Sequence, residues 1–506
     1  MEEQELRHQL ADAWRLIETR DQDQDAWLLF RDQAQHWTCL LDRFVRRPLA
    51  RLGLRICGAG GGRGCHGEGP KRCLALLPLG DVVSISCGVG EGRRWSRLSS
   101  EGVSLRVLTV VPYFHPAWSY GGIPRLAYGL SRALLERGHE VSVVTTDALD
   151  RDSRLPGGRV VVDGLDVTRL PNVSNRLAYD HQLFLPRGAA KTLDEQVASA
   201  DVVHLHGFWH LLNNVAVQAA ERHGVKVVMT PNGTLLPLER KLWVKRLWGE
   251  VLGGPVRQSV DRWIAVSQAE VNQFARAGIP SGQVHLVYNG LDLGEFEALP
   301  PRGAFRDRHG LGQRPMLLYL GKLTPRKGVE HLVSAMAHLD GLAWDREWGE
   351  SSSGIDPVLV IAGNDMGVQS ALESQVVRLG ISDRVHFVGL LEGEERLAVL
   401  ADADLLIYPS TDEIFGLVPF EGLLCGTPAV VTDDCGCGEL VSRARAGQLV
   451  RYGEPQAIAR AVASLLSDAQ RRRRMVARGR RFIEDHFSWP RIAIQTEAVY
   501  KAALRC

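Results

Sequence analysis

The chain has 506 residues, of which 45% are hydrophobic, so it is long enough for two to four globular domains with large cores. Its 60 basic and 59 acidic residues leave a net charge of +1, which argues against a nucleic-acid binder that works by bulk charge. No apolar run reaches the length of a membrane span, and we do not expect the charged start to act as a signal peptide. Nine cysteines without paired C-x2-C spacing disfavour structural zinc and indicate reduced thiols, so we expect a cytoplasmic protein.

The first hundred residues differ in composition from the rest of the chain. Residues 1–50 show helical periodicity, with Leu6, Leu10 and Trp14 on one stripe, and we expect this helical extension to mediate protein contacts. Residues 51–103 are rich in glycine and arginine and have low order, so we interpret them as a flexible linker.

Residues 104–288 alternate strand and helix patterns, which predicts a doubly wound α/β domain. Buried strands are expected at 105–111, 140–145, 201–205, 226–230 and 262–266. The loop after the first strand ends in Gly121 and Gly122 at a helix start, where the backbone can approach a phosphate closely.

Polar residues follow two later strands of this domain. His204 and His206 share one side of a strand end, and Asn232 lies in the loop after the next strand. No carboxylate or cysteine completes a ligand set with these histidines, so we expect no metal site there.

The segment 240–248 alternates basic and aromatic residues. One interpretation is a basic amphipathic helix that rests on an anionic membrane, and the other is a core-packed helix with solvated cations.

Residues 289–488 repeat the α/β pattern after a crossing at 289–292. Strands are expected at 316–320, 358–362, 385–388, 404–408 and 428–432. The polar insert 340–356 is predicted to be a loop, and a final helix is predicted over 489–504.

Two cations follow the strand at 317–320, because Lys322 and Lys327 bracket a proline-containing loop that leads into a helix. Two positive charges at a strand end suit a diphosphate and can neutralise the charge on a departing nucleoside diphosphate. The alternative interpretation is an ordinary solvated basic turn.

Two carboxylates, Glu413 and Glu421, stand eight positions apart on either side of a loop and a helix start. Unpaired amides at a helix N-terminus favour an anion, and a carboxylate one turn inside can accept hydrogen bonds from a pair of sugar hydroxyls. The pattern indicates a seat for a nucleotide sugar. A surface loop with a solvated glutamate is the alternative.

With these two segments together, the chain resembles the retaining glycosyltransferases of family 4 over residues 104–505. Glu413 and Glu421 match the family's E-x7-E pair, and residues 321–328 match its G-R-L-x-x-x-K-G motif. The resemblance implies a GT-B fold, in which two Rossmann-like domains face a cleft and the C-terminal helix, 489–506, crosses back onto the first domain.

The resemblance also implies roles for individual residues. Glu421 is expected to bind the donor's ribose, Glu413 to contact the transferred sugar, and Lys322 with Lys327 to clamp the diphosphate. Further donor contacts are implied for Gly122 and for the loop of Phe415, Gly416, Leu417 and Val418. His206 is implied in the sugar pocket, and weaker sugar or acceptor contacts are implied for Gly121, His204, Asn232 and Arg326.

Two positions depart from the family pattern. Lys322 stands where the family usually has arginine, which keeps the charge but loses the bidentate fork. Asn232 replaces the histidine of a P-H-G loop, and an amide cannot shuttle a proton at neutral pH.

The resemblance implies a hexosyltransferase that needs neither a metal nor another cofactor and takes a nucleoside-diphosphate sugar as co-substrate. We expect a saccharide or lipid-linked acceptor, a role in surface polysaccharide or glycolipid synthesis, and peripheral contact with the inner face of the membrane. Two alternatives stay open: another GT-B enzyme, such as an epimerase or a phosphorylase, and a weakly catalytic nucleotide-sugar-binding scaffold. Slow donor hydrolysis would separate a transferase from a scaffold.

Overall fold

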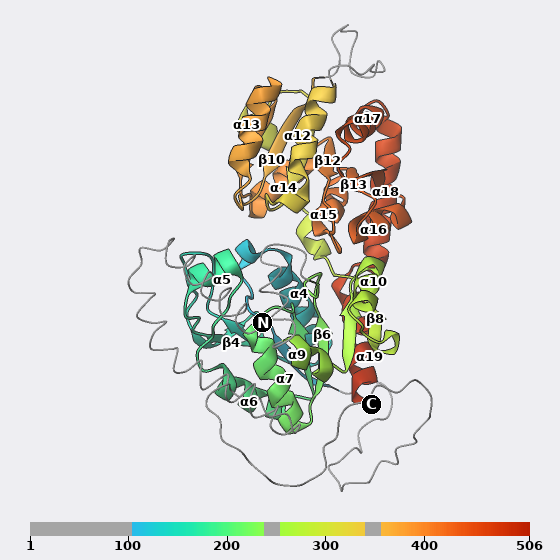
Figure 1. Cartoon of the computed structure of the whole chain (residues 1–506). Helices are drawn as coiled ribbons and strands as arrows, with labels where there is room; N and C mark the ends of the chain where they lie inside the picture. The colour runs from blue at the N-terminus through green and yellow to red at the C-terminus, as the bar shows by residue number, and fades with distance from the viewer. Residues whose placement is uncertain (1–103, 237–252, 340–355, 506) are drawn as a thin grey trace, which may run out of the picture. The chain divides into compact units, whose positions relative to one another are not determined.

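The computed structural model describes residues 104–236, 253–339 and 356–505 (Figure 1). The expected N-terminal helix, the glycine-rich linker, the basic segment 240–248 and nearly all of the polar insert lie outside these ranges. No helix within the described ranges is long and apolar enough to cross a membrane.

The first lobe is built on an eight-stranded sheet in the order β3-β4-β2-β1-β5-β6-β7-β8. The strands are β1 (Arg106–Val110), β2 (Glu140–Thr146), β3 (Gly158–Val162), β4 (Leu165–Leu170), β5 (Val202–His206), β6 (Lys226–Thr230), β7 (Arg262–Ala265) and β8 (Val284–Leu286). All neighbours are parallel except the antiparallel pair of β3 and β4. Helices cover both faces of such a sheet, which explains why all residues of β5, and all of β1 except Arg106, are buried.

The helices of the first lobe alternate with its strands except after β2, where β3 and β4 follow directly and α5 and α6 come in succession. They are α4 (Gly122–Glu136), α5 (Asn175–His181), α6 (Ala189–Ser199), α7 (Leu211–His223), α9 (Gly254–Ser259) and α10 (Gln268–Arg276).

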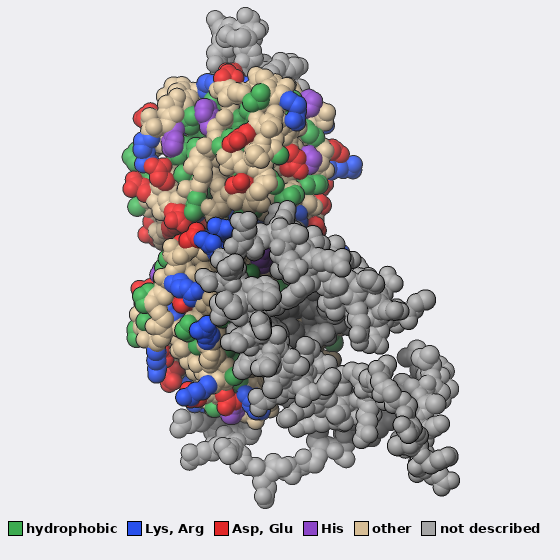
Figure 2. All heavy atoms as spheres, turned by 60° about the vertical axis from the view of Figure 1, so that its left-hand side comes forward, with side chains coloured by type: hydrophobic (Ala, Val, Ile, Leu, Met, Phe, Trp, Pro, Cys, Tyr) green, Lys and Arg blue, Asp and Glu red, His purple; other side chains and the backbone are tan. Residues whose placement is uncertain are grey.

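On the face shown in Figure 2, acidic, basic and hydrophobic side chains of the described residues are interspersed, in keeping with the near-neutral chain.

The second lobe has a six-stranded parallel sheet in the order β11-β10-β9-β12-β13-β14. The strands are β9 (Met316–Leu320), β10 (Val358–Ala362), β11 (Val385–Gly389), β12 (Leu405–Tyr408), β13 (Ala429–Thr432) and β14 (Gly447–Val450). The chain leaves the middle strand, β9, toward one edge and returns through β12 toward the other. Ligands of open α/β sheets bind at such a switch point, beyond the carboxyl ends of the strands.

The second lobe's helices alternate with these strands. They are α11 (Ala304–His309), α12 (Val329–His338), α13 (Gln369–Leu379), α14 (Gly393–Asp402), α15 (Leu417–Cys425), α16 (Gly436–Ala444), α17 (Pro455–Leu466) and α18 (Ala469–His486). Two short 3-10 helices, η5 (Leu293–Phe296) and η6 (Pro325–Lys327), stand before α11 and α12.

The last helix, α19 (Trp489–Leu504), belongs to the core of the first lobe. It packs on α4, β6 and β7, and its buried Ile492 and Tyr500 share a hydrophobic cluster with β1. The two crossings between the lobes also contact each other, because the Leu291 amide donates to the Phe487 carbonyl at 2.8 Å. A side chain at Gly290 would collide with Trp489, its Cβ lying 2.3 Å from the indole.

Candidate active site

The two motifs of the second lobe meet because β9 and β12 are neighbours in the sheet. η6 follows β9 and ends at Lys327, whose Nζ donates to the Tyr408 hydroxyl at 2.7 Å and to the Glu413 carboxylate. Gly328, at φ +62°, makes this approach possible, since a Cβ there would lie 2.2 Å from the Pro409 carbonyl oxygen. The second expected cation, Lys327, and the first expected carboxylate, Glu413, thus form one ion pair.

Glu413 is held by more than this lysine. Its Oε2 also accepts from the Tyr408 hydroxyl at 3.0 Å and lies 3.5 Å from Ser410 Oγ. Burial acts to raise the pKa of Glu413, but the Lys327 charge and these hydrogen bonds outweigh it and hold the pKa below its usual value. Glu413 is therefore an ionised, fixed carboxylate at neutral pH.

Arg326 lies in the same pair of loops. Its backbone carbonyl accepts from the Thr411 amide at 2.9 Å, and its charge adds to the lowering of the pKa of Glu413.

Lys322 reaches across to the first lobe. Its Nζ donates to the Tyr120 carbonyl at 2.9 Å, and a Cβ at Gly121 would lie 3.3 Å from that nitrogen. Burial, followed by the charge of Lys327, lowers the pKa of Lys322 to about 8. The structure therefore brings together two groups expected at the diphosphate, Lys322 and the glycine pair before α4.

The start of α15 faces the start of α4, since a Cβ at Gly122 would lie 3.7 Å from Leu417 Cδ1. α15 has Gly416 as its N-cap, at φ +68°, and receives no hydrogen bond from a capping side chain. The amides of this first turn, up to Val418, are thus offered to an anion. Phe415 packs its side chain against Phe487 with ring centroids 5.1 Å apart, so only its backbone is available to a ligand.

Glu421 lies one turn inside α15 and is only 6% exposed. Its Oε2 is 2.7 Å from Nη1 of the buried Arg396 on α14, as an ion pair rather than a well-aligned hydrogen bond. Arg396 also donates to Glu295 of η5. Burial acts to lower the pKa of Arg396, but Glu421 and Glu295 raise it above its usual value. The carboxylate expected at the ribose is thus fixed by a cation that sequence reasoning did not identify.

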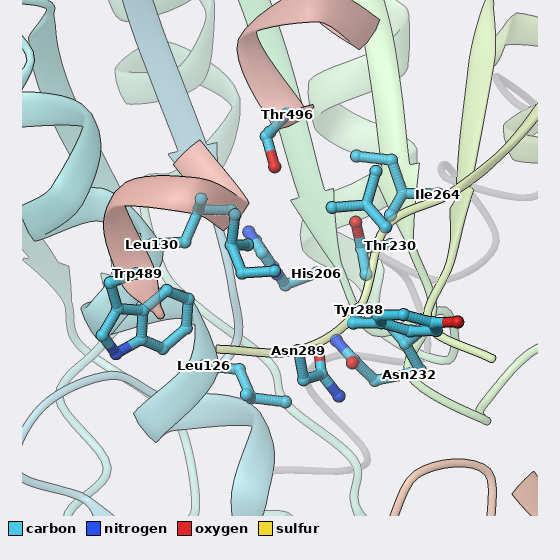
Figure 3. A pocket seen from close by; sticks show the side chains of 13 residues that line it. Leu126, Leu130, His206, Thr230, Asn232, Ile264, Tyr288, Asn289, Trp489 and Thr496 are labelled. Atoms are coloured by element: carbon cyan, nitrogen blue, oxygen red, sulfur yellow. The ribbon is translucent and has the colours of Figure 1, made fainter. Parts of the chain in front are cut away.

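His206 and Asn232 share a small cavity beneath the crossing helix (Figure 3). Both ring nitrogens of His206 and both amide atoms of Asn232 lack a hydrogen-bond partner within the described parts of the chain. The cavity, which Trp489 and Thr496 also line, has a volume of about 20 Å³. That is room for one water molecule and not for a sugar.

Burial, and the nearby His210, lower the pKa of His206 to about 3, so its ring is neutral at physiological pH. His204 is fully buried, with Nδ1 2.7 Å from the Tyr500 hydroxyl and Nε2 2.8 Å from Thr230 Oγ1. Both nitrogens of His204 thus join β5 to α19 and β6, and a sugar could bind His204 only by breaking these contacts.

Glu270, on α10, fixes the loop that carries Asn232, and it was not among the predicted site residues. Its two oxygens accept from the amides of Gly233 at 2.5 Å and Val266 at 2.8 Å. Burial raises the pKa of Glu270 to about 7, against the effect of these two hydrogen bonds. The pattern Ser267-x-x-Glu270 resembles a capping box and is the signal that could have pointed to it.

Metal ligands are not gathered in the described ranges. No group of three or more histidine, cysteine, aspartate or glutamate side chains there is placed to hold a metal ion. Metal independence remains a prediction.

Comparison with known proteins covers both lobes. The family model described as "Glycosyltransferase Family 4" matches residues 120–295, and the model "Glycosyl transferases group 1" matches residues 302–482. The chain is 30% identical to the D-inositol 3-phosphate glycosyltransferase of Jonesia denitrificans, over 75% of this chain and 91% of that protein. It is 27% identical to an uncharacterized glycosyltransferase of Methanocaldococcus jannaschii, over 78% and 98% of the two chains.

A solved structure supports the same fold. Anabaena HepE in complex with UDP superposes with a TM-score of 0.61 at 21% identity, over 79% of this chain and all of that one. The expected GT-B architecture of two Rossmann-like lobes is confirmed. The chain belongs to the family 4 glycosyltransferases.

Proposed function

We propose that this glycosyltransferase moves a hexosyl group from a nucleoside-diphosphate sugar to a hydroxyl acceptor, with retention of the anomeric configuration and without a metal ion. The observation that carries the proposal is the meeting of Lys322, Lys327 and the uncapped start of α15 at one switch point.

Similar proteins support the class of donor. Anabaena HepE has been crystallised with UDP and with UDP-glucose, and the relative in Jonesia denitrificans is named a D-inositol 3-phosphate glycosyltransferase. Transferred to this chain, these names support a nucleotide-sugar donor. They leave the base, the sugar and the acceptor undecided.

The donor would bind mainly to the second lobe. Glu421, held by Arg396, would accept hydrogen bonds from the ribose hydroxyls. The diphosphate would replace the Tyr120 carbonyl as the partner of Lys322, and it would take the amides at the start of α15. Lys327 would share its charge between Glu413 and the phosphate.

The reaction needs stabilisation of the charge that leaves with the diphosphate. The bond between the anomeric carbon and the phosphate oxygen breaks, and its electron pair goes to that oxygen beside Lys322 and Lys327. The acceptor oxygen bonds to the anomeric carbon from the same face, and its proton passes to the departing phosphate. Glu413 is already bound to Lys327 and Tyr408, which favours a positioning role over attack as a nucleophile.

For the acceptor, we propose a saccharide or a lipid-linked saccharide of surface polysaccharide or glycolipid synthesis. His206 and Asn232 would serve the sugar only if the cavity they line opens, because its present volume is too small. The membrane contact expected of segment 240–248 falls on residues outside the described ranges and stays a prediction.

The test is product analysis with purified full-length protein and a panel of UDP-, GDP- and ADP-sugars. We expect one donor to release its nucleoside diphosphate slowly in water and faster with an acceptor. Proton NMR of the early product should show the donor's anomeric configuration.

Three results would contradict the proposal. An inverted product would overturn retention, and loss of activity on chelation with recovery on adding a metal would overturn metal independence. No turnover of any donor, although a nucleotide binds, would favour the scaffold alternative.

A further inference from the structure

A basic groove lies on the second lobe, between the end of α16, strand β14 and helix α18. Its volume is about 630 Å³, within the range of small-molecule sites. Arg445, Arg471, Arg474 and Arg478 line it together with the neutral Ser442 and Gln448, and its lining contains no acidic residue.

The arginines of this groove have no carboxylate partner within the described ranges. The side chains of Arg474, Arg478 and Arg445 form no ion pair or hydrogen bond there. The guanidinium of Arg471 is oriented by two neutral acceptors, Gln448 Oε1 at 2.5 Å and Ser464 Oγ at 3.0 Å. Four positive charges therefore converge on one hollow without compensation, and an anion there would relieve their mutual repulsion.

The arginines of α18 differ in their surroundings, and those of the groove are exposed to solvent except for the partly buried Arg471. The helix has seven arginines against two acids, but two of the seven act inside the fold. Arg472 donates to the Leu466 carbonyl at 2.6 Å, and Arg480 donates to the Leu424 carbonyl at 2.5 Å. Arg471, Arg474 and Arg478 are spaced three and four apart and share the face toward β14.

Arg445 adds a second element to the site. It caps the C-terminus of α16 at φ +51°, a left-handed conformation that glycine or asparagine adopts with less strain. A charged side chain is thus presented to the groove from a backbone position that does not favour it.

We propose that this groove binds a ligand that carries clustered phosphate groups. Guanidinium groups match phosphate oxygens with paired hydrogen bonds, and several unpaired arginines around one hollow fit two or more phosphates better than a single carboxylate. The groove lies at β14, the edge strand of the sheet, whereas the candidate active site lies at the β9–β12 switch point. The inference therefore does not depend on the proposed function.

The test compares two double variants of the full-length protein. Arg474→Gln with Arg478→Gln removes two charges from the groove. Arg460→Gln with Arg473→Gln removes the same charge from exposed positions of α17 and α18 outside it. Inositol hexakisphosphate and tripolyphosphate are titrated into each by calorimetry, and phosphatidylcholine vesicles with and without phosphatidylglycerol are tested by co-sedimentation.

We expect the groove variant to lose about tenfold or more in affinity, and the control to lose little. Weakened binding of the soluble phosphates would identify a free ligand, and weakened binding of the anionic vesicles alone would identify a lipid headgroup. Lys327→Met distinguishes phosphate binding in the groove from phosphate binding at the candidate active site, because binding in the groove should survive in that variant.

Equal binding by wild type and groove variant, or equal losses in both double variants, would overturn the proposal. Arg445→Gly tests whether lost binding is due to misfolding. It removes a charge from the groove and also relieves the strain of the left-handed backbone at that position. This variant should melt at or above the wild-type temperature and still bind the phosphates more weakly.

Discussion

Two pairs of charged residues in the second lobe and two polar residues in the first lobe differ in whether their side chains have partners. In the second lobe two pairs of opposite charges hold each other: the partly buried Lys327 with Glu413, and the buried Arg396 with Glu421. In the first lobe, the side chains of His206 and Asn232 have no hydrogen-bond partner in the described parts of the chain, and burial keeps His206 neutral.

The side chains of the second-lobe site are fixed before a ligand binds, whereas those of the first-lobe site still lack hydrogen-bond partners. Paired charges keep their geometry before a ligand arrives, so little reorganisation is needed when a diphosphate binds. Buried polar atoms without partners cost free energy, which a water or a ligand hydroxyl would recover. We infer that the second lobe is organised for the donor in advance and that the first lobe completes its site on binding.

The largest expected effect comes from breaking a pair of the second lobe. Arg396→Met leaves the buried Glu421 and the partly exposed Glu295 without their cation and should lower the free energy of unfolding by about 3–5 kcal/mol. Chemical denaturation measures this. Adding Glu295→Gln should recover part of the loss, because one of the two unpaired carboxylates is then neutral. A loss below about 1 kcal/mol would mean that the pair behaves like an exposed one.

Lys327→Met should act chiefly on turnover. The departing diphosphate loses one of its two cations, and kcat should fall by about 10²–10³, the usual cost of removing one such contact. Steady-state kinetics with the identified donor measures it. Lys191→Met, which removes an exposed lysine of α6, is the control for charge. Equal kcat values in wild type and Lys327→Met would exclude this lysine from the site.

Glu270 predicts a pH dependence of stability. Its pKa is raised to about 7 in the folded state, so folding favours the protonated form. The stabilisation that comes from protonated Glu270 is complete below about pH 4.5, the ordinary pKa of the group, and is lost as the pH rises through 7. The loss amounts to about 3 kcal/mol of unfolding free energy. Denaturation between pH 5 and 8 should show this slope in wild type and not in Glu270→Gln. An unchanged slope in the variant would assign it to other groups.

Lys322 predicts a smaller effect on binding. Its pKa of about 8 in the free protein should rise when a diphosphate binds, because the anion stabilises the ammonium form. Affinity for the nucleoside diphosphate should then be constant below pH 8 and fall by up to about tenfold per unit above it. Lys322→Arg should remove this dependence between pH 8 and 9.5, as calorimetry would show. A similar decline in the variant would point to another group.

The sequence was most informative where strands are fully buried. β9, β10 and β12 lie where the apolar runs predicted them, because strands covered on both faces cannot alternate with polar residues. The hairpin of β3 and β4 was missed, although its turn, Asp163-Gly164, has the residues that a tight hairpin favours. Its partly exposed strands lack a strong apolar run.

The contacts of the candidate site were less predictable. Lys327 and Glu413 come from separate loops, and only the sheet order brings them to the same hydroxyl, that of Tyr408. The pairing of Glu421 with Arg396 depends on how α14 and α15 pack, for which no local pattern exists. The small cavity at His206 depends on α19, whose register on the first lobe no motif records.

The most direct test of the account is a calorimetric titration of nucleoside diphosphates into wild type, Glu421→Gln and the exposed control Glu484→Gln. We expect one nucleotide to bind wild type and the control alike, and to bind Glu421→Gln at least about tenfold more weakly, because the ribose loses a charged acceptor. Equal affinity for all three proteins would contradict the assignment of Glu421 and, with it, the claim that the second lobe is a donor site built in advance.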